Sequence, residues 1–197
     1  MILPITAYGN PVLRKVGVDI EKDYPDLDVL IQNMKETMAN AQGVGLAAPQ
    51  IGKAIRLFLV DTSAFADDEE LEEEERAFLK DFNKVFINAE ILDETGDEWV
   101  FNEGCLSIPD VREDVFRQET VTIEYYDENF KKHTQVLSGL AARVVQHEYD
   151  HIEGILFTDK LSSLKKRLIK KKLENISKGK INPDYRMSYF NPKKKTS

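Results

Sequence analysis

The chain has 197 residues, 42% of them hydrophobic, and a formal charge of −8. A chain of this length buries about 70% of its unfolded surface in one core, so a single domain over residues 1–197 is expected. The longest apolar runs, such as 57–60, fall far short of the roughly 18 residues that cross a membrane. The N-terminus has no basic segment before Pro4, so no secretory signal is expected and the cytoplasm is favoured.

The charges are separated along the chain. Residues 67–75 hold eight carboxylates and no base, and without them the formal charge would be zero. Residues 165–172 hold six bases and no acid, and 193–195 add three lysines. The chain therefore carries an acidic and a basic local field rather than a uniformly acidic surface.

Hydrophobic spacing predicts a first helix and a largely antiparallel sheet. Apolar residues between 27 and 38 recur at helical spacing, and Gly43 is suited to end that helix. The acidic stretch at about 62–80 is too charged to pair in a sheet, and we expect an exposed, solvated insertion there. Asp127-Glu-Asn129 is typical of a hairpin turn between alternating segments. The expected strands are 55–61, 84–92, 98–101, 120–126 and 131–137.

Two further helices are expected in the C-terminal third. Ser138 is a suitable N-cap and Gly154 a suitable stop for a helix over 138–153. A basic amphipathic helix over 161–176 follows, which as an ordinary solvated helix would turn Leu164 and Leu168 inward. A polar tail at about 178–197, with prolines at 183 and 192, ends the chain.

The segment His147-Glu148-Tyr149-Asp150-His151 carries the main chemical signal. Its two histidines lie four residues apart, about 40° around a helix and ~6 Å along it, so both can bind one metal ion from one side. The alternative is a pair of structural histidines bonded to backbone or carboxylates. The remaining histidine, His133, stands alone on a hairpin strand and is expected to be structural.

A catalytic metal site needs a third protein ligand. Position 157 is Phe, which excludes the metzincin continuation, and Glu174 lies in a basic helix without the usual zincin surroundings. Cys105 is the leading candidate, although a lone cysteine is also a common buried apolar residue.

Three motifs occur together in one order: Gly43-Val-Gly-Leu-Ala-Ala-Pro-Gln50, Glu103-Gly-Cys-Leu-Ser107 and Gln146-His-Glu-Tyr-Asp-His151. Together they resemble the motifs of bacterial peptide deformylase over about residues 3–165. The acidic stretch 62–80 and the tail after about 178 depart from that family, and neither touches a motif residue.

The resemblance implies a metal bound by Cys105, His147 and His151, with a fourth position for water. Such a donor set accepts Fe²⁺, Zn²⁺, Ni²⁺ or Co²⁺, and deformylases commonly use ferrous iron. Glu148 would take and return the proton of the attacking water. The backbone N–H of Leu106 and the amide of Gln50 would stabilise the oxyanion, although Gln50 could equally anchor its own loop.

The resemblance also implies where a peptide binds. Val44, Gly45 and Gly104 would present backbone to an extended peptide, and Phe101, Leu140 and Val144 would form the methionine pocket unless they are simply core. Asp150 faces away from the metal, and we expect it to pair with an arginine such as Arg117.

Together the sequence predicts a single α+β domain in which antiparallel strands pack around a central metal-binding helix, with an N-terminal and a C-terminal helix. The predicted function is removal of formate from N-formylmethionyl nascent chains in the bacterial cytoplasm. The basic C-terminal helix could add a weak contact with the ribosome, and neither membrane nor DNA is an expected partner. The alternatives are a small metallopeptidase, which would not need Gln50 or Cys105, and a non-catalytic metal or nascent-chain binding protein.

Overall fold

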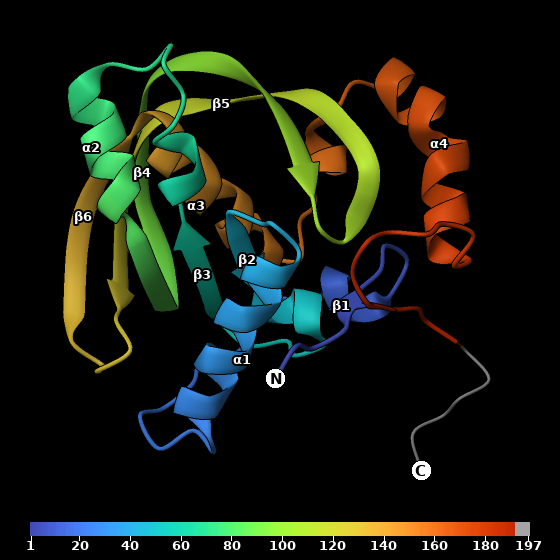
Figure 1. Cartoon of the computed structure of the whole chain (residues 1–197), viewed down its shortest axis with the longest axis horizontal. Coiled ribbons are helices and arrows are strands. Elements are labelled where there is room, and N and C mark those ends of the chain that lie inside the picture. The colour runs from blue at the N-terminus through green and yellow to red at the C-terminus, as the bar shows by residue number, and fades with distance from the viewer. Residues whose placement is uncertain (192–197) are drawn as a thin grey trace.

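An antiparallel sheet of five strands, in the order β2-β3-β4-β5-β6, forms the framework of the molecule (Figure 1). The computed structural model describes residues 1–191. The five strands are β2 (Gly45–Ala47), β3 (Leu57–Asp61), β4 (Asn83–Cys105), β5 (Ile108–Tyr126) and β6 (Lys132–Ser138). A small parallel sheet joins β1 (Ile5–Thr6) to β7 (Met187–Ser188). The predicted α+β class and antiparallel sheet are confirmed.

Strands β4 and β5 are much longer than the sequence indicated. The segments predicted separately as 84–92 and 98–101 belong to one strand, whose register against β5 shifts at three places before Glu98. Strand β5 begins at Ile108, whereas the sequence predicted a strand only from Thr120. The charged side chains of 112–119 do not suggest a strand. These residues nevertheless form one, because their backbone hydrogen-bonds to β4 and this pairing does not depend on the type of side chain. The predicted hairpin at 127–129 is confirmed, with Tyr126 opposite Lys132.

Helices α1 (Leu27–Asn40) and α3 (Gly139–Ile152) cover opposite faces of the sheet, and both confirm their predictions to within a few residues. In β3, Phe58 and Val60 pack in the cluster that includes α3. Leu57 and Leu59 pack in the cluster that includes α1. Because successive strand residues point to opposite faces, a strand buried on both sides has to be apolar throughout. This explains the run Leu57-Phe58-Leu59-Val60.

The acidic segment is largely exposed, as the sequence predicted, but it is ordered and partly helical. It contains a short 3₁₀ helix, Ser63–Phe65, and helix α2 (Glu73–Asp81). Leu79 is buried, and Phe65 and Leu71 pack against the core, while most of the carboxylates remain exposed. A few apolar residues spaced through the acidic run are enough to fix it against the sheet.

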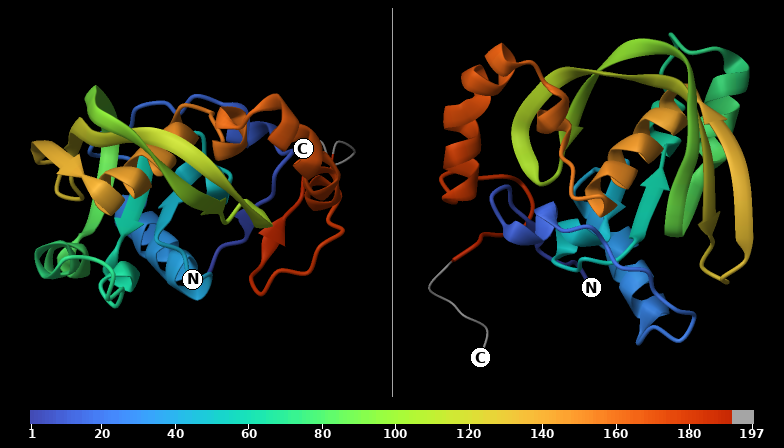
Figure 2. Two further views of the ribbon diagram at one scale, coloured as in Figure 1. Left: turned by 90° about the horizontal axis from the view of Figure 1, so that it is seen from above. Right: turned by 180° about the vertical axis from the view of Figure 1, so that it is seen from behind.

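Helix α4 (Ser163–Ser177) corrects the expected orientation of the basic helix. It buries Ile169, Leu173 and Ile176, whereas Leu164 and Leu168 are 59% and 70% exposed. In Figures 1 and 2, α4 lies at the end of the molecule opposite α2 and β6. Pro192 and the lysines at 193–195 lie outside the described residues, among which no helix is long and apolar enough to cross a membrane.

Candidate active site

Helix α3 brings the two histidines and the glutamate of the His-Glu-x-x-His segment to one buried place. His147, Glu148 and His151 are 9%, 4% and 1% exposed. The two imidazole rings lie 5.1 Å apart between centroids, as their four-residue spacing on a helix requires. Gly154, at a φ of 72°, allows the chain to leave the helix directly after these residues.

Cys105 reaches the histidines from the end of β4. It pairs with Ile108 across a tight turn, and its Sγ lies 3.3 Å from Nε2 of His151. Within residues 1–191, Cys105, His147 and His151 form the one group of three such side chains whose donor atoms converge, all within 4.8 Å of one another. A sulfur and two imidazole nitrogens at this separation suit a divalent transition metal, so the residues fit the group that the sequence implies.

Glu103 organises the surroundings of His147. Its Oε2 accepts a hydrogen bond of 2.9 Å from Nδ1 of His147, which leaves Nε2 as the nitrogen available to a metal. Arg117 donates two bonds to the same carboxylate, at 2.7 and 3.0 Å, and a third, of 2.7 Å, to Asp150. The predicted pairing of Asp150 with Arg117 is confirmed. Arg143 also donates to Glu103, at 3.0 Å, and lies over the Trp99 ring.

The charges of this cluster follow from burial and from these bonds. Burial alone would raise the pKa of Glu103, but the hydrogen bonds from His147 and Arg117 hold it well below its usual range. Burial lowers the pKa of His151, with nearby positive charges adding to the effect, so this imidazole is neutral and able to coordinate. Glu103 therefore stays ionised while His151 keeps a free lone pair.

Glu148 lies in the pocket with an orphaned oxygen. Its Oε2 is buried and accepts no hydrogen bond from the described residues. Burial raises the pKa of Glu148 to about 7, which suits a group that accepts and returns a proton near neutral pH. A Cβ at Gly45 would stand 2.3 Å from Oε1 of Glu148, so only glycine lets β2 pass this close.

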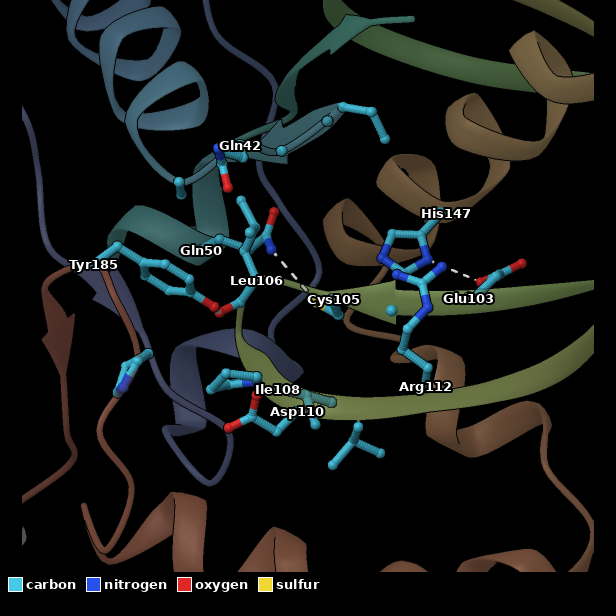
Figure 3. A pocket seen from close by; sticks show the side chains of 18 of the residues that line it. Gln42, Gln50, Glu103, Cys105, Leu106, Ile108, Asp110, Arg112, His147 and Tyr185 are labelled. Atoms are coloured by element: carbon cyan, nitrogen blue, oxygen red, sulfur yellow. Dashed lines mark hydrogen bonds and ion pairs between the residues drawn. The ribbon is translucent and has the colours of Figure 1, made fainter. Parts of the chain in front are cut away.

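Gln50 and Leu106 flank Cys105. The Oε1 of Gln50 accepts a 2.7 Å bond from the backbone N–H of Ala47, and its Nε2 donates toward Sγ of Cys105 at 3.5 Å (Figure 3). The amide therefore anchors its own loop through one end and faces the site through the other. Leu106 follows Cys105 in the turn, and its side chain packs on Gly43, where a Cβ would lie 2.7 Å from Cδ1 of Leu106.

These side chains share a pocket of about 520 Å³. Of the residues expected to bind peptide, the lining includes Val44, Gly45, Phe101, Gly104 and Val144. Leu140 does not line it and packs in the core under the sheet instead. Four further lining residues, 182–185, come from the tail and were not predicted, because they follow Cys105 by almost eighty positions and belong to no motif.

His133 does not line this pocket. It bonds to Asp127 at 2.7 Å and stacks on Tyr125 at 5.3 Å between ring centroids. It is a structural residue of the β5–β6 hairpin, as the sequence predicted.

A His-Glu-x-x-His helix with a thiol beside it, on an antiparallel sheet, defines a site of the metallohydrolase class. The model of the family described as polypeptide deformylase matches residues 2–167. The chain belongs to that family, which confirms the resemblance seen in its motifs.

Named relatives and solved structures agree with this membership. The chain is 69% identical to a peptide deformylase of Christiangramia forsetii, over 98% of this chain and 99% of the relative. It is 64% identical to a peptide deformylase of Flavobacterium johnsoniae, over 98% of this chain and 99% of that relative. A crystal structure of a peptide deformylase from Legionella pneumophila matches with a TM-score of 0.76 and 37% identity, covering 91% of this chain and 98% of that one.

Proposed function

We propose that the chain hydrolyses the formamide of N-formylmethionyl peptides, adding water to give formate and a free N-terminal amine. One observation carries the assignment to this site: Cys105, His147 and His151 converge at the pocket that holds the buried Glu148, whose Oε2 has no hydrogen-bond partner among the described residues. We propose newly made bacterial polypeptides as the substrates and therefore the bacterial cytoplasm as the place of action.

In this proposal each residue has one task. Cys105, His147 and His151 hold one divalent metal ion, for which we propose Fe²⁺. A bound metal ion of this kind supplies Lewis acidity, which lowers the pKa of water and polarises a carbonyl. Glu148 accepts a proton from the attacking water and passes it to the departing amine. Gln50 Nε2 and the Leu106 N–H donate to the oxygen of the formyl group, while Glu103 holds His147 in place.

The pocket supports a role in binding for several backbone and apolar groups. Val44, Gly45 and Gly104 line the pocket, and their backbone groups are those that we assign to an extended peptide. Phe101 and Val144 are the apolar lining that we assign to the methionine side chain, with Arg143 beside them.

Formate release tests the function directly. Protein purified without oxygen and analysed for metal should release formate from formyl-Met-Ala-Ser and leave acetyl-Met-Ala-Ser and an internal peptide bond intact. Cleavage of the internal bond would identify a metallopeptidase instead. Absence of any turnover by protein with its ferrous iron bound would favour the non-catalytic binding protein.

Replacing Cys105 by serine should change metal occupancy or identity and strongly reduce turnover, because a neutral hydroxyl is a poor substitute for a thiolate ligand. Metal content per protein and formate release are measured on the same preparation. Ser107→Ala, a change in the same turn, serves as the control. Normal metal content and rate in the Cys105 variant would exclude it as a ligand.

We also propose a weak contact between α4 and the ribosome. Lys166, Arg167, Lys170 and Lys171 are exposed, and Leu164 and Leu168 extend beside them into solvent. Contacts of a few bases with phosphates release counterions, so binding should weaken steeply with salt. Co-sedimentation with ribosomes over a salt series measures it.

The matched control removes the same number of positive charges from exposed positions outside α4. Glutamine at 166, 167, 170 and 171 should abolish co-sedimentation. Glutamine at the exposed lysines 15, 22, 53 and 131 should preserve it. Equal binding by the two variants, or no binding at low salt, would contradict the proposal without affecting the proposed reaction.

A further inference from the structure

The C-terminal tail returns from α4 to the pocket and is fixed there at two points. It turns at Gly179, where φ is 66° and the ring of Tyr189 packs against the glycine. Farther on, β7 pairs with β1, where Ile5 N–H donates to the carbonyl of Arg186 at 2.8 Å. Between these points, residues 182–185 form part of the pocket lining. The tail is therefore an ordered part of the pocket wall.

Tyr185 connects this wall to the turn that follows Cys105. Its hydroxyl donates a hydrogen bond of 2.8 Å to the backbone carbonyl of Leu106 (Figure 3). Partial burial raises the pKa of Tyr185, so the hydroxyl keeps its proton, and hence its ability to donate, throughout the physiological range.

Two other contacts hold the same turn. The backbone N–H of Tyr8 donates to the carbonyl of Ser107 at 2.9 Å. The side chain of Leu106 packs so closely on Gly43 that a Cβ there would lie 2.7 Å from it. The carbonyl and the N–H of Leu106 are joined by the φ and ψ of a single residue, so fixing the direction of the carbonyl limits where the N–H can point.

We propose that Tyr185 is a positioning residue: by holding the carbonyl of Leu106 it limits the backbone angles of that residue, so that the Leu106 N–H faces the developing oxyanion. The inference rests on the proposed function, which gives that N–H its role. A donor stabilises an oxyanion well only when it is oriented before charge develops, because reorientation during the reaction costs part of the gain. The hydroxyl acts through Leu106 and does not itself touch the substrate.

Tyr185→Phe tests this because it keeps the ring in the wall and removes only the donor. We expect kcat to fall about 10-fold, within the range that small misplacements produce, with KM changed by less than about twofold. Metal content should be unchanged. Tyr189→Phe is the matched control, since Tyr189 belongs to the same tail and does not line the pocket, and it should keep the parent kcat.

A second measurement does not depend on activity. Amide hydrogen exchange of a peptide covering residues 103–109, in protein with equal metal content, should be several-fold faster in Tyr185→Phe than in Tyr189→Phe, because the turn loses one of its restraints. An unchanged kcat, a change confined to KM, or equal exchange in the two variants would overturn the proposal. An unsubstituted enzyme that releases no formate, with faster exchange in Tyr185→Phe, would instead contradict the proposed function and leave Tyr185 as a restraint on the turn.

Discussion

Glu148→Gln should lower kcat for formate release by about 100-fold or more, the usual contribution of a positioned acid–base group. Glutamine has nearly the same shape but cannot accept and return a proton at neutral pH. The adjacent ligands are untouched, so bound metal should remain at the parent level. Formate release and metal analysis on one preparation measure both quantities.

The control for this substitution is Glu90→Gln, at an exposed position of β4. It removes the same charge from the molecule without touching the pocket and should keep the parent rate. A fully active Glu148 variant would refute the role of Glu148. Loss of both metal and activity would instead assign Glu148 to maintenance of the metal site.

Gln50→Leu should reduce kcat by roughly 10² to 10³-fold, the effect expected from removing one oxyanion donor. KM should rise much less, because the lost hydrogen bond strengthens only as charge develops on the oxygen. Steady-state kinetics on formyl-Met-Ala-Ser separate the two parameters. A change confined to KM would assign Gln50 to binding of the ground state.

The structure adds a second expected effect of this substitution. Oε1 of Gln50 accepts the N–H of Ala47, a buried residue, and leucine leaves that donor unsatisfied. An unsatisfied buried group costs about 1–3 kcal/mol of unfolding free energy. Urea denaturation should show this loss, while the control Gln32→Leu, at an exposed position of α1, should show little change in either stability or kcat.

Short-range patterns in the sequence determined the parts of the site that lie on one element. The spacing of His147 and His151 places both on one face of any helix, and that face is buried because it continues the apolar positions of α3. The hairpin at 127–129 and the end of α3 before Gly154 follow from equally local signals. The pairing of Asp150 with Arg117 was expected from the resemblance, and the spacing along the helix does not determine it, because the arginine comes from β5.

Only the tertiary structure decided features in which distant segments meet. Residues 112–119 form a strand because β4 supplies their backbone partners, and the acidic segment is ordered because Leu79 finds a place in the core. In α4 the apolar residues occupy two faces, and the buried one is the face that the neighbouring cluster can accept. Tyr185 reaches Leu106 across 79 positions. The periodic pattern of hydrophobic residues cannot predict such a contact, because the contact depends on which surfaces meet after the chain has folded.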